Sequence, residues 1–395
     1  MRSVSSSQVA LLEDWQHGGF GLYIHWPFCQ AKCPYCDFNS HVSSQIDQTR
    51  WLAAYLSELD RVAALTGPRI LDSVFFGGGT PSLMAPETVA GILERVRKNW
   101  RLSNSLEVTL EANPTSVEAG KFRGFRDAGV NRISMGVQAL NDADLKALGR
   151  LHSVAEARTA FDIARTTFDR VSFDLIYARQ DQTLSDWRSE LTAALDMAID
   201  HLSLYQLTIE DGTAFGMRHA AGRLTGLPSE DLAADMYEVT QEVSAAAGMP
   251  AYEVSNHARP GEESRHNLIY WRYGDYAGIG PGAHGRLTLN GMRTATYAPA
   301  APGAWLHAVE SAGTGQSESD ALTAEDQFTE FALMGLRLNE GVRADRFSAL
   351  SGGSCDANLA DLVDLGLLEV TPERIRATPK GRPMLNAVLS KLLGG

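Results

Sequence analysis

Three of the four cysteines of this chain, Cys29, Cys33 and Cys36, lie in the stretch "GLYIHWPFCQAKCPYCDFNS", residues 21–40, with C-x3-C-x2-C spacing. Three thiolates on a short loop can bind three irons of a [4Fe–4S] cluster, whereas a cluster held only by protein would use four. The missing ligand would leave one iron open to the amino and carboxylate groups of a small molecule, as an open position makes a zinc site catalytic. A zinc site is the alternative, with His25 or His41 as the nearest fourth ligand, although neither has zinc spacing.

Further polar residues follow the predicted strands of the first half of the chain. They are Gly77-Gly78-Gly79-Thr80-Pro81 after the second strand, Glu111 at the end of the third, Gln138 at the end of the fourth, Arg150 beyond it, and Asp174 on the fifth. Because the carboxyl ends of parallel barrel strands meet at one mouth, we expect these residues to lie together with the cysteines.

The residue types at this mouth suit a ligand that joins an amino acid to a nucleoside. The glycines can offer backbone N–H and C=O groups to an ammonium and a carboxylate. Glu111 could accept from the ammonium and Arg150 could bind the carboxylate. Asp174 and Gln138 could bind ribose hydroxyls, as acidic residues do in dinucleotide folds. Taken singly, each would be an ordinary turn or strand-end residue, so the argument depends on their joint placement.

Short apolar runs alternate with amphipathic segments and predict the elements that position these residues. The runs, typical of buried parallel strands, are 22–26, 73–76, 107–111, 132–138, 171–177 and 201–209; helices are predicted at 117–129, 153–168 and 230–248. Right-handed βαβ units of this kind predict an α/β fold with a partial (β/α)6 barrel, since six units are fewer than the eight of a closed barrel.

The chain divides into four predicted parts. Residues 1–20 are expected to be a flexible lead-in, and 21–250 the partial barrel. Residues 251–320 are rich in glycine and aromatic residues and include an extended connector at 295–304. Residues 321–395 are predicted to form a small helical, winged-helix-like module, whose first helix begins with Thr323 and Asp326 at capping-box spacing.

Composition excludes several classes of protein. The chain has 395 residues, 44% of them hydrophobic, and a formal net charge of −13 at pH 7, which disfavours a nucleic-acid binder because such proteins need a basic surface. The sequence contains no run of about 18 apolar residues, so no membrane-spanning helix is predicted, although peripheral membrane contact stays possible. Glu13 and Asp14 and the lack of an apolar segment predict that no secretory signal is present. Clustered cysteines are unlike a secreted disulfide framework, so we expect a cytoplasmic protein with reduced thiols.

The motifs together resemble the HemN-like branch of the radical S-adenosylmethionine (SAM) superfamily. The likeness spans residues 21–392 and is carried by "YIHWPFC", "GGGTPS", "LEANP", "ISMGVQ", "DLIY" and "YEVSN". It implies that the three clustered cysteines hold a [4Fe–4S] cluster. It also implies SAM contacts from residues around the mouth: Tyr23, Tyr35, Gly78, Gly79, Thr80, Glu111, Gln138, Arg150 and Asp174.

Two features distinguish the branches of this family. The coproporphyrinogen III dehydrogenases have an additional cysteine where this chain has Phe38, and a longer N-terminal arm. The stretch His266-Asn267-Leu268-Ile269-Tyr270-Trp271 is instead similar to the H-N-x-x-Y-W motif of the heme-chaperone branch, HemW. The resemblance implies heme as cargo, with contacts from His266, Tyr270 and Trp271; an axial imidazole between aromatic walls suits a porphyrin face.

By this resemblance we expect a heme chaperone that delivers heme to apo-hemoproteins such as respiratory enzymes. Oxygen-independent coproporphyrinogen III dehydrogenase is the alternative, and a radical SAM enzyme acting on an unrelated substrate is a third. His266 could equally be a packed core histidine, which leaves His257 and His284 as other heme ligands. Where relatives read "DLIYGLPxQT", this chain has Ala178-Arg179-Gln180 in place of the Gly-Leu-Pro segment, so the shape of that turn is expected to differ.

Overall fold

The computed structural model describes residues 14–43 and 45–394. Most of the predicted lead-in, residues 1–13, therefore lies outside the described residues. Residues 14–20 form a short 3-10 helix, η1 (Asp14–His17), and the first residue of strand β1. Asp14 is 2.7 Å from the guanidinium of Arg346, so this segment is attached to the C-terminal part of the chain.

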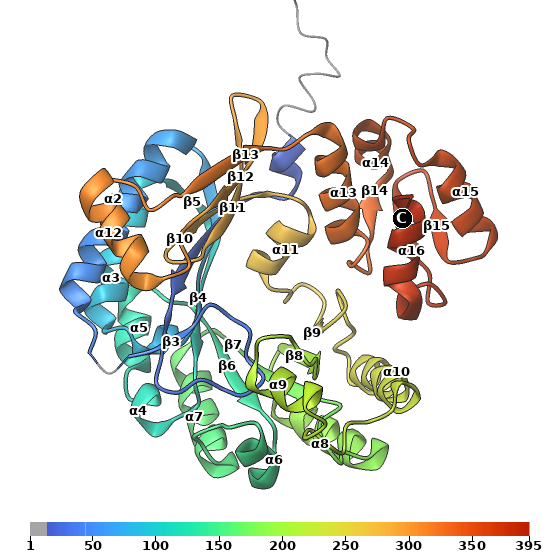
Figure 1. The fold of residues 1–395 in the computed structure, drawn as a ribbon, viewed down its shortest axis with the longest axis horizontal. Coiled ribbons are helices and arrows are strands. Elements are labelled where there is room, and N and C mark those ends of the chain that lie inside the picture. The colour runs from blue at the N-terminus through green and yellow to red at the C-terminus, as the bar shows by residue number, and fades with distance from the viewer. Residues whose placement is uncertain (1–13, 44, 395) are drawn as a thin grey trace, which may run out of the picture.

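Six parallel strands form the centre of the sheet, which confirms the six predicted βα units (Figure 1). They lie side by side in chain order: β1 (Phe20–Trp26), β4 (Ile70–Gly78), β5 (Arg101–Ala112), β6 (Arg132–Gln138), β7 (Arg170–Tyr177) and β8 (His201–Gln206). β1 pairs on its other side with β10 and β8 with β9, so the two ends of this set do not pair with each other. The six units therefore form a partial barrel.

Helices surround these strands, most of them on the outer face (Figure 1). They are α2 (Gln48–Thr66), α3 (Pro86–Asn99), α4 (Ser116–Ala119), α5 (Phe122–Ala128), α6 (Asp142–Ala147), α7 (Val154–Thr167), α8 (Leu184–Met197), α9 (Ala214–Ala220) and α10 (Glu230–Ala246). Of these, α6 and α9 pack beside Tyr35 of the cysteine loop. The predicted helices at 153–168 and 230–248 are confirmed, and that at 117–129 is split into α4 and α5. Capping boxes at Ser153 and Thr183 begin α7 and α8, and Gly129 ends α5 with a φ of +114°.

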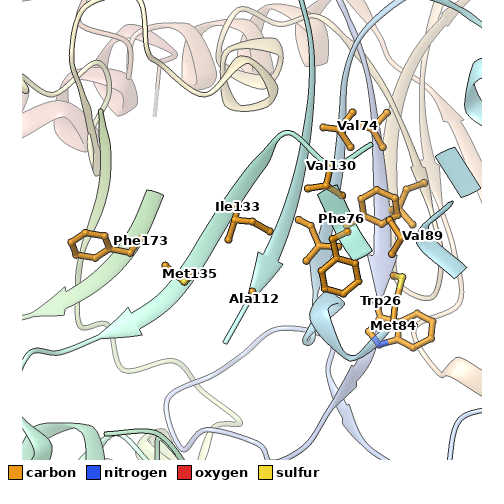
Figure 2. Close-up of a cluster of buried hydrophobic side chains, with 14 of the residues drawn as sticks. Trp26, Val74, Phe76, Met84, Val89, Ala112, Val130, Ile133, Met135 and Phe173 are labelled. Atoms are coloured by element: carbon orange, nitrogen blue, oxygen red, sulfur yellow. The ribbon is translucent and has the colours of Figure 1, made fainter. Parts of the chain in front are cut away.

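Alternate residues of each strand point to opposite faces of the sheet. Figure 2 shows Val74 and Phe76 of β4 with Val89 of α3 in the apolar layer between strands and helices, where all three side chains are fully buried. The alternate residues of these strands face the opposite, concave side of the sheet, and many of them are polar and buried. They include Ser73, Glu107, Thr109, Arg132, Ser134, Ser172 and Ser203. The concave face of the sheet can therefore form hydrogen bonds and ion pairs with a polar ligand.

Residues 251–320 enlarge the sheet to eleven strands, which the sequence did not predict. β10 (Asp275–Ile279) adds in parallel to β1 and is followed by antiparallel β11 (His284–Leu289), β12 (Met292–Tyr297) and β13 (Glu318–Ala321), while β9 (Asn256–Ala258) pairs with β8. In the expected connector at 295–304, only residues 298–301 lie between β12 and helix α12 (Pro302–Ala312).

The C-terminal residues form a separate small core, as predicted. Its order is α13 (Ala324–Gly335), β14 (Val342–Arg343), α14 (Ala344–Ser351), α15 (Asp356–Asp364), β15 (Leu368–Val370), β16 (Arg374–Ala377), η3 (Arg382–Met384) and α16 (Leu385–Leu392). The capping box of Thr323 and Asp326 is confirmed. A three-stranded sheet among short helices agrees with a winged-helix-like module. None of the helices in the described part of the chain is long and apolar enough to cross a membrane.

Candidate functional site

The cysteine loop follows β1 at the carboxyl end of the parallel strands. Cys29 ends the short strand β2 (Phe28–Cys29), which pairs with β3 (His41–Val42), and the Cys36 N–H donates to the Cys33 carbonyl at 3.2 Å. Burial raises the pKa of the Cys29 and Cys36 thiols, and their mutual repulsion with Cys33 raises it further. All three thiols are free. Binding a metal cluster would therefore release protons.

The three cysteines are not arranged for a single metal ion. In residues 14–43 and 45–394, no set of three histidine, cysteine or acidic side chains is placed to hold one. A [4Fe–4S] cluster has a different requirement, because its three cysteine ligands bind three separate irons. The described geometry thus gives no support to the zinc alternative, whereas the soft thiolate donors suit an iron–sulfur cluster.

The glycine-rich turn after β4 fixes the position of this loop. The N–H groups of Gly79 and Thr80 donate to the carbonyls of Trp26 and Phe28 at 2.7 and 2.8 Å. We expected backbone N–H groups of this turn to be available to a ligand, but these two are already used. A Cβ on Gly79 would lie 2.7 Å from the Phe28 carbonyl oxygen, so glycine is required for this close approach.

Two positive or polar groups point at the cysteine sulfurs. The Thr80 hydroxyl donates to the Cys29 sulfur, and the Arg150 guanidinium donates to the Cys33 sulfur, both at 3.4 Å. Arg150 also donates to Asn113 Oδ1 at 2.6 Å and to the Gly136 carbonyl at 2.8 Å. Asn113, in the quoted "LEANP", was not among the predicted site residues, and its place two residues after Glu111, directly beyond the end of β5, was the available signal.

Glu111 and Asp174 approach each other across the concave face. Burial, and secondly the charge of Asp174, raise the pKa of Glu111 to about 8, against the opposing effect of the Gly78 N–H. Burial raises the pKa of Asp174 to about 6, although Ser203, Arg132 and Arg150 oppose that rise. At neutral pH this leaves Asp174 mostly ionised and Glu111 mostly protonated, and a cation bound beside Glu111 would favour the ionised form of its carboxyl.

Gln138 ends β6 in a strained conformation. Its φ is +74°, in the left-handed region that non-glycine residues seldom adopt, and the pairing of β6 with β7 shifts register just before it. Its Oε1 is buried without a hydrogen-bond partner in the described structure. A buried acceptor left unpaired fits the expected hydrogen bond from a ligand hydroxyl.

The two predicted tyrosines lie on either side of this mouth. Tyr23 donates to or accepts from His25 Nδ1 at 3.0 Å, and Tyr35 packs its ring against Phe215 of α9. Burial raises the pKa of both phenols, and Arg150 opposes the rise for Tyr35. Both phenol groups are therefore uncharged, and their rings border the site.

The helix α11 (Arg265–Trp271), which carries the H-N-x-x-Y-W motif, lies on the concave side of the barrel (Figure 1). His266 is buried and stacks on Phe75 at 4.9 Å between ring centroids, with Tyr23 at 6.4 Å. Its Nδ1 is 2.7 Å from the Ser73 hydroxyl and its Nε2 is 2.8 Å from the Tyr270 hydroxyl. Burial lowers the pKa of His266 to about 3, so the imidazole is neutral. Axial binding to iron would require exchange of one of these hydrogen bonds.

The remaining motif and histidine residues are placed differently. Trp271 packs in a small cluster with Tyr252 and Leu338, on the side of α11 that faces the C-terminal module. His257 is fully buried on β9. His284 is exposed at the start of β11, with its ring 5.0 Å from that of Tyr297. Of the three candidate heme-binding histidines, His284 alone is open to solvent in this structure.

The turn that departs from the family sequence is held by a buried arginine. Ala178 has a φ of +58°, although it has a side chain. Arg179 is buried and pairs with Asp144 at 2.8 Å and Glu190 at 2.6 Å. Its ion pairs connect the end of β7 to α6 and α8, so the turn is anchored without the glycine and proline, and Asp174 keeps its place on β7.

Comparisons with known proteins show the family of this chain. The family model of the radical SAM superfamily matches residues 23–192, and that of the HemN C-terminal domain matches 322–384. The chain is 39% identical to the heme chaperone HemW of Mycobacterium tuberculosis, over 95% of this chain and 95% of that protein. It is 37% identical to HemW of Escherichia coli, over 94% and 97%. It is 38% identical to the mitochondrial radical S-adenosyl methionine domain-containing protein 1 of Bos taurus, over 94% and 87%.

Among solved structures, the chain is similar to coproporphyrinogen III oxidase (HemN) of Escherichia coli. The TM-score is 0.80 and the superposition covers 99% of this chain and 93% of that one, at 21% sequence identity. At this identity the likeness concerns the fold, and it includes the C-terminal module as well as the partial barrel.

Proposed function

This chain belongs to the radical SAM superfamily, in its HemN-like branch, and from that premise we propose that it is a heme chaperone, which binds heme and transfers it to apo-hemoproteins. The observation that carries the proposal is the neutral imidazole of His266, held between aromatic rings in a chain 37–39% identical to proteins named as heme chaperones. A neutral imidazole is the form that binds iron.

In this proposal the protein also carries a [4Fe–4S] cluster and SAM. Cys29, Cys33 and Cys36 hold the cluster, and the residues around the mouth contact SAM: Tyr23, Tyr35, Gly78, Gly79, Thr80, Glu111, Gln138, Arg150 and Asp174. A cluster with one open iron supplies the electron that radical chemistry on SAM requires. The chain's own contribution is to orient that ligand, with Glu111 toward an ammonium and Asp174 and Gln138 toward hydroxyl groups.

The heme contacts proposed are His266, Tyr270 and Trp271. His266 must exchange the Tyr270 hydroxyl for iron at Nε2, because Ser73 occupies Nδ1. Recipients would be apo-hemoproteins such as respiratory enzymes, reached by peripheral contact where they are membrane-bound. We further propose a cytoplasmic location, because all four cysteines are unpaired, as a reducing compartment would keep them.

Oxygen-independent coproporphyrinogen III dehydrogenase remains the second candidate. Phe38 stands where that enzyme has its additional cysteine, and its side chain is 61% exposed at the end of the cysteine loop. This position therefore offers no thiol to the mouth, which favours the chaperone. A radical SAM enzyme acting on an unrelated substrate is the third candidate, and heme binding that depends on His266 would speak against it.

The deciding experiment uses anaerobically purified protein with its cluster reconstituted. Heme is titrated and the Soret band followed for wild type, His266→Ala and the control His307→Ala, which removes an exposed histidine on α12. We expect saturable binding that only His266→Ala removes, transfer of the heme to an apo-cytochrome b, and no turnover of coproporphyrinogen III with SAM and a reductant. Formation of protoporphyrinogen IX would establish the dehydrogenase instead.

A further inference from the structure

A second cavity lies away from the cysteine mouth, between barrel helix α10 and the C-terminal module. Its volume is about 520 Å³, within the usual range for small-molecule sites. Its walls come from α10 and from the segment around β16 and η3. Its polar lining includes Tyr237, Glu238, Gln241, Glu369, Arg376 and Arg382. No residue of the proposed cluster, SAM or heme sites lines it.

Arg382 is the exceptional group in this cavity. It is half-buried and forms no ion pair within the described ranges, whereas Arg346 of the same module pairs with Asp14 at 2.7 Å. Its Nη2 donates to the Arg337 carbonyl at 3.3 Å, and its Nη1 is buried without any hydrogen-bond partner. Burial lowers the pKa of Arg382, and Tyr237 and the charge of Glu253 oppose this, although neither Glu253 nor any other described carboxylate forms an ion pair with Arg382. A guanidinium that is partly desolvated and unpaired is destabilising until an anion compensates its charge.

The neighbouring charges restrict which anion would fit, because the carboxylate of Glu238 also lines the cavity and the charge of Glu253 acts on Arg382. Arg376 is already paired with Glu369 at 2.9 Å, and both are well exposed, so that pair forms the solvent side of the cavity. The guanidinium of Arg382, beside a tyrosine hydroxyl and side-chain amides, suits a single carboxylate, because a carboxylate can accept two parallel hydrogen bonds from an arginine. The Gln241 side chain adds a polar group for the rest of the ligand.

We propose that this cavity binds a carboxylate-bearing small molecule, with Arg382 as the anchor of its carboxylate. The carboxylate has two chemical sources: a free aliphatic acid, or a propionate arm of a tetrapyrrole. The second source rests on the proposed heme function and the first does not. The cavity is also connected to the H-N-x-x-Y-W motif through its lining residue Asn339. The backbone N–H of Asn339 donates to the Tyr252 carbonyl, and Leu338, the residue before Asn339, packs in the same cluster as Trp271.

The test measures binding of two probes to the full-length protein by calorimetry: glutarate, and protoporphyrin IX, which lacks iron and so cannot use a histidine ligand. Loss of the charge-assisted bond in Arg382→Gln is expected to weaken binding about 10-fold or more, and Arg382→Lys to restore part of it. Arg165→Gln, which removes an exposed arginine of α7, is the control and should leave binding unchanged. Glutarate is not a tetrapyrrole, so binding of glutarate that depends on Arg382 separates this cavity from the proposed heme site.

Each result decides the proposal. Arg382-dependent binding of glutarate supports it with a free acid as ligand, and Arg382-dependent binding of protoporphyrin IX alone supports it with a tetrapyrrole. Failure of wild type to bind either probe would overturn it, as would equal binding by Arg382→Gln with an unchanged circular dichroism spectrum. If Arg382→Gln does not fold, the same comparison is made with Tyr237→Phe and with Arg382→Lys, and equal binding by both would again overturn it.

Discussion

The hydroxyl of Tyr270 lies 2.8 Å from Nε2 of His266, one helical turn earlier on α11. The other ring nitrogen faces the Ser73 hydroxyl at 2.7 Å, so the two hydrogen bonds together determine the position of the imidazole, and because both partners are hydroxyls either ring nitrogen can carry the proton. Ser73 comes from β4, and its bond fixes the helix inside the barrel. Tyr270 belongs to the same motif as His266, and it therefore covers the nitrogen that would bind iron.

Replacing Tyr270 with phenylalanine should strengthen heme binding. The variant keeps the ring contacts but removes a hydrogen bond worth about 0.5–1.5 kcal/mol, so heme affinity should rise roughly 2- to 10-fold. Soret titrations compare it with Tyr276→Phe, which changes a neighbouring ring without touching His266. Unchanged affinity in Tyr270→Phe, with full binding in His266→Ala, would place the iron ligand elsewhere, and His284 would be examined next.

The raised pKa of Glu111 predicts a pH-dependent stability difference. Its pKa is about 8 in the folded protein and near 4.5 when exposed, so between these values the unfolded chain is ionised and the folded chain keeps its proton. Wild type therefore loses stability through this group as pH rises across that window, and above about pH 8 the loss is constant. Glu111→Gln removes the effect.

Urea denaturation of ligand-free protein at about pH 5 and about pH 8.5 measures this difference. We expect the stability of Glu111→Gln relative to wild type to increase from the lower to the higher pH. The exposed Glu94→Gln on α3 is the control and should show no such trend. A difference that is constant, or that shrinks at high pH, would mean that Glu111 is ionised in the folded protein.

The sequence predicted the six central strands because each is an apolar run of suitable length. β6 was predicted with its bounds, residues 132–138, since Gly129 ends the preceding helix and Gln138 ends the run. Strands β10 to β13 were missed because they are short, and β10 and β11 are also interrupted by glycines. Gly278 shows the reason for such interruptions: a Cβ there would overlap the backbone of His284, so the two strands pack too closely for a side chain.

The candidate site was predictable where its residues end parallel strands, as Glu111 does, because that rule needs no knowledge of distant contacts. The surroundings of Asp174 were not predictable, since Arg132 begins β6, Ser203 lies inside β8, and neither belongs to a motif. The position of His266 depends on Ser73, 193 residues away, and only the folded chain brings them together.

The turn at Ala178 predicts a stabilising substitution. Its φ of +58° is unfavourable for alanine, whereas glycine adopts it without strain. Ala178→Gly should stabilise the protein by roughly 0.5–1 kcal/mol, the relief of strain less the added entropy of the unfolded chain. Chemical denaturation measures the change. Ala308→Gly, in the middle of helix α12, is the matched control and should be destabilising, as glycine is in helices. A loss of stability in Ala178→Gly would show that the turn is not strained.

The contact between Gly79 and Phe28 connects the glycine-rich turn to cluster binding. A methyl group at Gly79 would lie 2.7 Å from the oxygen, 2.9 Å from the carbon and 3.0 Å from the nitrogen of the Phe28 backbone, and backbone cannot move aside as a flexible side chain can. Gly79→Ala must therefore displace the chain directly before Cys29. Because the Thr80 N–H also donates to the Phe28 carbonyl, that displacement should disturb the Thr80 contact with the Cys29 sulfur as well.

We expect Gly79→Ala to keep its secondary structure by circular dichroism but to hold much less iron and sulfide per chain after reconstitution. Gly303→Ala is the control, because a Cβ at Gly303 meets no atom within 4 Å, and its iron content should equal that of wild type. Cys29→Ser, Cys33→Ser and Cys36→Ser should each lower the iron content at least as much, and Cys355→Ser, buried in the C-terminal module, should not. A full complement of iron in Gly79→Ala would mean that the cysteine loop adjusts freely, and that the turn does not determine where the cluster is held.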